Sequence, residues 1–120
     1  MKTVLLADDF ELMHEACGSM LRAGGFRVLH ARDTGEAVRL AREEVPSLIL
    51  MDLMMPGEGG IAAARELRDD PRTAGIPIVA VTAAVALVGT DQLEEEGFSG
   101  LLAKPFTLDE LMAEVRRYLP

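Results

Sequence analysis

Short apolar runs alternate with longer segments in which apolar residues recur every three or four positions along this chain of 120 residues. The short runs have the length of strands, and the longer segments have the period of amphipathic helices. Such alternation is typical of a parallel sheet with helices on both faces. The predicted strands are 3–7, 26–31, 47–51, 76–81 and 99–103, and the predicted helices are 10–23, 34–44, 59–69, 85–96 and 107–119.

Local signals support several of these elements. Asp33 with Glu36, and Thr107 with Glu110, have the spacing of capping boxes at helix starts. The apolar spacing of the last helix predicts that its charged residues, Glu114 among them, point mostly outward. The second strand mixes polar and apolar residues, which predicts an edge strand. No linker or repeat interrupts the chain, so residues 1–120 are expected to form one domain.

Composition narrows the function classes. The chain is 49% hydrophobic and 27% charged, and no apolar stretch approaches the roughly 20 residues that span a bilayer. Met1-Lys2 leads directly into the first strand and leaves no room for a signal peptide, so we expect a cytoplasmic protein and no membrane partner. A formal net charge of −8 repels phosphate backbones, which argues against direct binding of nucleic acid.

Polar side chains follow four of the predicted strands. Asp8 and Asp9 end the first, Asp52 the third, Thr82 the fourth and Lys104 the fifth. In an open parallel sheet these ends share one edge, where ligands bind at the topological switch point. Clustered carboxylates favour Mg²⁺ or Mn²⁺, and a carboxylate can attack phosphorus where a metal and an ammonium neutralise the charge. The sequence therefore predicts a site for a divalent cation and a phosphoryl group.

These residues also form motifs that belong together. The motifs are Asp8-Asp9, Asp52-x-x-Met55-Pro56-x-x-x-Gly60, Thr82-Ala83 and Lys104-Pro105-Phe106. They resemble the motifs of the receiver domain of bacterial response regulators, and the likeness covers essentially the whole chain. The resemblance implies a flavodoxin-like (βα)5 doubly wound parallel sheet with strand order 2-1-3-4-5.

The resemblance implies a role for each acidic residue. Asp52 would be the phosphoacceptor, taking a phosphoryl group from the phosphohistidine of a histidine kinase in a Mg²⁺-dependent reaction. Asp9 and Asp52 would bind the metal directly, and Asp8 mainly through water. The backbone carbonyl of Met54 would supply a further oxygen.

The resemblance also implies roles for the remaining site residues. Lys104 would pair with a phosphate oxygen, and the Thr82 hydroxyl and the Ala83 N–H would bind others. The bond before Pro105 is usually cis in this family. Leu101 replaces the aromatic residue that often couples to the threonine as a switch, which predicts a different readout of phosphorylation.

Two positions predict a long-lived phosphoryl group. In this family the residues two beyond the phosphoacceptor and two beyond the threonine often steer the hydrolytic water. Met54 and Ala84 occupy these positions and cannot hold water by side-chain hydrogen bonds.

The leading hypothesis is a single-domain receiver that signals by altered protein contacts. Its partners would be a sensor histidine kinase or histidine phosphotransfer protein, and a downstream effector that docks on helix four, strand five and helix five. It would be no enzyme beyond catalysing its own phosphorylation and dephosphorylation.

Other hypotheses about the function remain open. The chain could be a receiver excised from a hybrid kinase or multidomain regulator, or a scaffold that is never phosphorylated. An aspartyl-phosphate hydrolase would need an acid at Met54, and a flavin carrier would need a hydroxyl-rich first turn instead of Asp8-Asp9-Phe10-Glu11.

Three further residues carry chemistry that this function does not use. Cys17 sits among apolar residues of the first helix, which favours a small buried thiol over a redox sensor. His14 and His30 lie on different elements, and we expect both at the surface with no metal.

Overall fold

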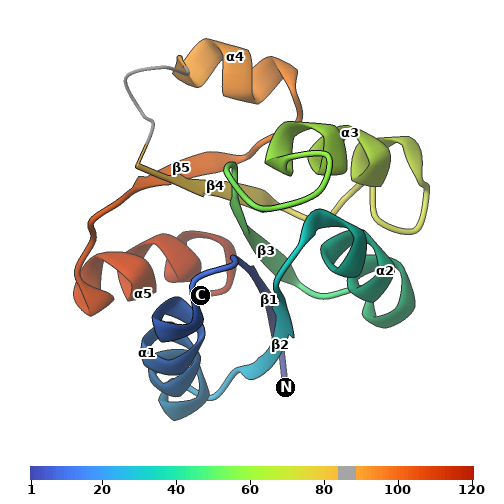
Figure 1. The fold of residues 1–120 in the computed structure, drawn as a ribbon. Helices are drawn as coiled ribbons and strands as arrows, with labels where there is room; N and C mark the ends of the chain where they lie inside the picture. The colour runs from blue at the N-terminus through green and yellow to red at the C-terminus, as the bar shows by residue number, and fades with distance from the viewer. Residues whose placement is uncertain (84–88) are drawn as a thin grey trace.

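A single parallel sheet organises the protein, and its strand order is β2-β1-β3-β4-β5 (Figure 1). The structure is a computed structural model and describes residues 1–83 and 89–120. In chain order the elements are β1 (Thr3–Ala7), α1 (Glu11–Ala23), β2 (Arg27–Ala31), α2 (Thr34–Glu44), β3 (Leu48–Asp52), α3 (Gly60–Asp69), β4 (Ile78–Thr82), α4 (Thr90–Glu95), β5 (Gly100–Ala103) and α5 (Leu108–Tyr118).

Two helices cover one face of the sheet. Figure 1 shows α1 and α5 side by side on this face. Successive strand residues point to opposite faces, so every second strand position meets these helices. The side chains between the sheet and these two helices form an apolar cluster, which includes Val4 and Leu6 of β1 and Leu21 of α1, all fully buried. Its other buried members are Met13, Cys17, Leu48, Leu50, Val79, Val81, Leu102, Leu111, Val115 and Leu119.

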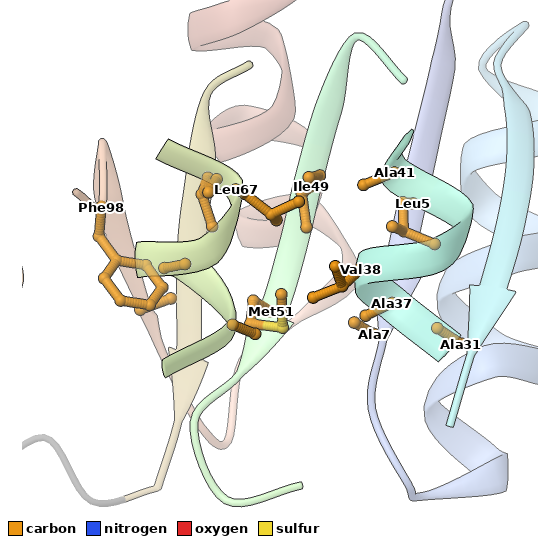
Figure 2. Packing of buried hydrophobic residues seen from close by; sticks show 14 of the residues in the cluster. Leu5, Ala7, Ala31, Ala37, Val38, Ala41, Ile49, Met51, Leu67 and Phe98 are labelled. Carbon is orange, nitrogen blue, oxygen red and sulfur yellow. The ribbon is translucent and has the colours of Figure 1, made fainter. Parts of the chain in front are cut away.

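Helices α2, α3 and α4 pack on the opposite face. Figure 2 shows Val38 of α2 and Leu67 of α3 pointing at the sheet residues between them. Leu67 has no exposed surface, and burying such a side chain stabilises a fold by about 1.5–3 kcal/mol. The residues labelled in the figure are Leu5, Ala7, Ala31, Ala37, Val38, Ala41, Ile49, Met51, Leu67 and Phe98.

The connections diverge between β1 and β3. The loop after β1 leads to α1 on one face, and the loop after β3 leads to α3 on the other face. A crevice forms at such a switch point, beyond the carboxyl ends of the two strands. The acidic residues predicted from the sequence lie at these two ends.

The predicted fold class and strand order are confirmed, and most element boundaries agree within two residues. The second strand is an edge strand, as its mixed composition predicts. The fourth helix is shorter than predicted: α4 covers Thr90–Glu95, and the predicted start at 85–88 lies outside the described residues. Gly89 is its extended N-cap residue.

Two helix starts have the predicted caps. Thr107 and Glu110 form the full capping box of α5. Asp33 caps α2 by accepting the Glu36 N–H, but the Glu36 carboxylate accepts the Arg32 N–H in place of the Asp33 N–H.

The outward position predicted for Glu114 is wrong. Its side chain is buried on α5 next to Val115, and it pairs with Arg117 at 3.0 Å. The buried stripe of α5 is therefore wider than the apolar spacing indicates.

Among the helices in the described ranges, none combines the length and the apolar character that crossing a bilayer requires.

Candidate phosphoryl and metal site

Asp8 is buried at the end of β1 and is held from several directions. Its N–H donates to the Ala31 carbonyl of β2 at 3.0 Å. One carboxylate oxygen, Oδ1, accepts the Phe10 N–H at 2.8 Å, which bends the chain into the loop before α1. The other, Oδ2, accepts from Lys104 Nζ at 2.7 Å. The orientation of this carboxylate is therefore fixed by the backbone and by a cation.

Asp52 is the last residue of β3, and its side chain is also buried. Its Oδ1 accepts the Met54 N–H at 2.9 Å, and its Oδ2 lies 3.3 Å from Lys104 Nζ. The strand end and the first turn of the following loop thus aim the carboxylate at the ammonium.

Lys104 connects the two carboxylates. Its burial lowers the pKa of the ammonium, but hydrogen bonds and Coulomb attraction from Asp8 and Asp52 outweigh this effect and raise the pKa above its ordinary value. The side chain therefore stays cationic at neutral pH, where it can offset negative charge that gathers beside Asp52.

The three carboxylates form a cluster that suits a hard cation. Each of Asp8, Asp9 and Asp52 offers an oxygen within 4.8 Å of the others, and among the described residues this is the one such group of three. Asp9 is exposed, while the other two are buried. Carboxylate oxygens are the hard ligands that Mg²⁺ prefers. The donor set thus fits the predicted metal.

The loop after Asp52 packs closely against its own strand. A Cβ at Gly60 would lie 2.8 Å from the Asp52 carbonyl oxygen, so only glycine lets α3 begin this near to β3. The side chain of Met54 is 71% exposed and points away from packed structure. The spacing between Asp52 and Gly60 therefore reflects how close the start of α3 lies to the end of β3.

The fourth and fifth strands bring the remaining predicted residues to the same edge. Thr82 is fully buried at the end of β4 and pairs in register with Ala103 of β5. Ala83 follows it and is exposed. The peptide bond between Lys104 and Pro105 is cis, as expected.

Leu101 is partly buried and packs against the cluster beneath α2, α3 and α4. Together with Leu93, Phe98 and Arg117 it lines a surface pocket of about 190 Å³. Ala84, the second position predicted to affect hydrolysis, lies outside the described residues.

The surface positions predicted for the two histidines are wrong. His14 is only 2% exposed, and its Nδ1 lies 2.8 Å from Nδ1 of the partly buried His30. Its Nε2 lies 2.7 Å from the carbonyl oxygen of Asp8. The helical spacing of Met13, Cys17 and Leu21 could have placed His14 on the buried stripe of α1.

The buried thiol predicted at Cys17 is confirmed. Its side chain is 3% exposed and donates to the Met13 sulfur at 3.4 Å. Burial, together with the Asp8 carboxylate, raises the pKa of the thiol. A thiol of this kind is a packing group.

Comparison with known families identifies the arrangement. Residues 4–116 match the family described as the response regulator receiver domain. The polar-differentiation response regulator DivK of Brucella anthropi is 30% identical over 118 residues, which cover 98% of this chain and 96% of DivK.

Solved structures agree with this match. The receiver domain of the sensor histidine kinase PA1611 from Pseudomonas aeruginosa is 34% identical, with a TM-score of 0.88 over 98% of this chain and 97% of that one. Its crystal structure has a magnesium ion coordinated in the active site cleft. The chemotaxis response regulator CheY4 of Vibrio cholerae is 25% identical, with a TM-score of 0.92 over 98% of each chain.

Proposed function

Because this chain belongs to the response regulator receiver domain family of two-component signalling, we propose that it takes a phosphoryl group from a phosphohistidine onto Asp52. The observation that carries the proposal is the position of Asp52, buried beside two other carboxylates with its Oδ2 3.3 Å from the Lys104 ammonium. A carboxylate in this setting can act as a nucleophile because the charge that develops around it is offset.

The transfer exchanges one bond to phosphorus for another. A carboxylate oxygen of Asp52 attacks the phosphorus, the P–N bond to the donor imidazole breaks, and the electron pair of that bond stays on the imidazole nitrogen. Lys104 pairs with an equatorial oxygen of the phosphoryl group. The Thr82 hydroxyl and the Ala83 N–H bind the other oxygens once the acyl phosphate has formed.

A divalent cation completes the charge balance. Asp9 and Asp52 would hold Mg²⁺ directly, Asp8 through water, and the Met54 carbonyl would add a backbone oxygen. The ion supplies electrostatic neutralisation of the phosphoryl oxygens. Mn²⁺ offers the same preference for oxygen ligands and would substitute for it.

The partners follow from this chemistry. The donor is a sensor histidine kinase or histidine phosphotransfer protein in the cytoplasm. The effector docks on the face formed by α4, β5 and α5, where Leu101 and Arg117 line the small pocket. The chain catalyses only its own phosphorylation and dephosphorylation, and it signals by altered protein contacts.

Intact mass after incubation with acetyl phosphate and Mg²⁺ tests the proposal. The wild type should gain one phosphoryl group, and neither Asp52→Asn nor the wild type in EDTA should gain any. Asp69→Asn is the matched control, because Asp69 is an exposed aspartate on α3 and its replacement should leave labelling unchanged.

Labelling of Asp52→Asn to the wild-type level would place the phosphoryl group elsewhere and refute the assignment. The wild type could also stay unlabelled by both acetyl phosphate and phosphorylated histidine phosphotransfer proteins, while a reference receiver labels normally. That result would replace the proposed function with the hypothesis of a scaffold that is never phosphorylated.

A further inference from the structure

Strand β2 holds both peptide groups that flank Asp8. The N–H of Asp8, in the Ala7–Asp8 peptide, donates directly to the Ala31 carbonyl. The carbonyl oxygen of Asp8, in the Asp8–Asp9 peptide, lies 2.7 Å from Nε2 of His14, whose Nδ1 contacts Nδ1 of His30 on the same strand. Neighbouring residues of β2 thus hold one of these peptide groups directly and the other through His14.

The chemistry of the contacts fixes which atoms carry protons. A carbonyl oxygen only accepts, so His14 Nε2 must be protonated and donate to Asp8. In the neutral imidazole the other nitrogen of His14 then accepts, and His30 must donate from its own Nδ1. The order of donation therefore runs from His30 through His14 to Asp8.

The packing makes room for this pair. A Cβ at Gly18 would lie 3.1 Å from Cε1 of His30, so glycine in the middle of α1 lets the His30 ring lie against the helix. The rings are tilted by 60°, with centroids 4.9 Å apart. Burial is the main cause that lowers the pKa of His30. Coulomb repulsion from His14, Arg32 and Arg22 lowers this pKa further, which keeps the imidazole neutral at pH 7.

We propose that His14 is a positioning residue for the phosphoryl site, which holds the Asp8 carbonyl through Nε2–H, and that His30 orients His14. The proposal rests on the function proposed above. The held carbonyl belongs to the peptide group between Asp8, whose side chain anchors the Lys104 ammonium, and Asp9. Rotation of this peptide group would displace the exposed Asp9 carboxylate and disturb the backbone that carries Asp8.

Magnesium affinity measures this role without phosphorylation. Isothermal titration calorimetry with MgCl₂ should show about tenfold weaker binding for His14→Leu than for the wild type, the loss typical when a group that orients a metal ligand is removed. His14→Gln keeps an N–H donor in the same region and should restore most of the affinity. His30→Leu should lose affinity to an intermediate degree.

A stability control separates positioning from general loosening of α1. Leu21 is fully buried on the same helix, two turns beyond His14, and belongs to the apolar cluster that includes Val4 and Leu111. Leu21→Val should lower the melting temperature without weakening Mg²⁺ binding. Unchanged affinity in folded His14→Leu, or an equal loss in Leu21→Val of matched stability, would overturn the proposal.

The proton positions give a second, independent test. Nitrogen-15 NMR of the histidine rings at pH 7 should show a proton on His14 Nε2 and on His30 Nδ1. A His14 ring without a proton on Nε2 would overturn the proposal, because it could not donate to Asp8. If the wild type shows these protons but binds no Mg²⁺, the metal part of the proposed function fails while the histidine contact stands.

Discussion

At the scale of single residues, Asp8 contacts several elements of the fold through its backbone and its side chain. Its N–H contacts β2, its Oδ1 caps the turn before α1, and its Oδ2 meets Lys104 after β5. The acidic pair was predictable because it ends an apolar run. The hydrogen bonds of the histidines behind it were not predictable, because a lone histidine in a sequence does not reveal which ring nitrogen will find an acceptor.

We predict that two single positions prolong the lifetime of the phosphoryl group on Asp52. Met54 is largely exposed and can hold no water by hydrogen bonding, and Ala84 is equally apolar. The double variant Met54→Asn, Ala84→Glu should therefore lose its phosphoryl group about tenfold faster, since it can orient the attacking water. The decay of the phosphorylated mass with time measures the rate.

The variant Met54→Leu, Ala84→Val serves as control and should decay at the wild-type rate. A half-life of the double variant equal to that of the wild type would contradict this explanation of persistence.

The thiol of Cys17 is predicted to be unreactive in the folded protein. Because burial raises its pKa, the thiolate fraction at pH 8 is below that of a free cysteine, and the side chain is also covered. Reaction with a chromogenic disulfide should be at least about tenfold slower in the native protein than in urea. The difference should narrow as the pH rises toward the raised pKa. Equal native and unfolded rates at pH 8 would contradict the buried position.

At the scale of elements, the period of a strand or helix indicates which side chains face the core better than the polarity of each residue does. On β2, Val28 and His30 share a face because strand residues alternate, and Val28 packs with the cluster beneath α1. That parity could have placed His30 toward α1, although we expected it at the surface from the sequence. On α5, Glu114 follows Leu111 by three positions and precedes Val115, so it lies on the buried stripe in spite of its charge.

Helix α3 fixes the turn between α4 and β5. The Arg68 guanidinium donates to the Gly97 carbonyl at 2.6 and 2.9 Å, to the Ile76 carbonyl at 2.6 Å and to the Ala74 carbonyl at 2.9 Å. One turn earlier, Arg65 pairs with Glu96. These contacts tie the carboxyl end of α4 to α3.

Removing the guanidinium should therefore destabilise the fold. Arg68→Met leaves three carbonyls without this donor, and we expect a loss of about 2 kcal/mol in the free energy of unfolding. Arg65→Met removes a more exposed pair and should cost less than Arg68→Met. Urea denaturation of the two variants measures both losses. A cost for Arg65→Met equal to that for Arg68→Met would show that the carbonyl contacts add nothing.

At the scale of the whole molecule, the motifs were enough to predict the strand order. They were not enough to predict where the fourth helix begins. The four polar strand ends meet because parallel strands end at one edge, which required no knowledge of side-chain contacts. The start of the fourth helix did not follow, because an apolar run interrupted by Gly89 fits a helix or a loop equally well.

Binding of a divalent cation should stabilise the whole fold. The acidic cluster exists only in the folded chain, so MgCl₂ at a concentration of 100 times its Kd should raise the free energy of unfolding by about 2.7 kcal/mol. Asp9→Asn should lose most of this gain because it removes a direct ligand. Thermal melts with MgCl₂, and with NaCl at the same ionic strength, separate binding from screening. An equal gain in NaCl would show that screening alone is responsible.

The contact between Lys104 and Asp8 joins residues 96 positions apart and links the end of β1 to the end of β5, past β3 and β4. While the protein is being synthesised, the acidic residues leave the ribosome long before the lysine does. A nascent chain that ends before β5 has its carboxylates but no Lys104 ammonium to balance them. Under the proposed function, such a chain would not yet accept a phosphoryl group, so it would not compete with the finished protein for the donor.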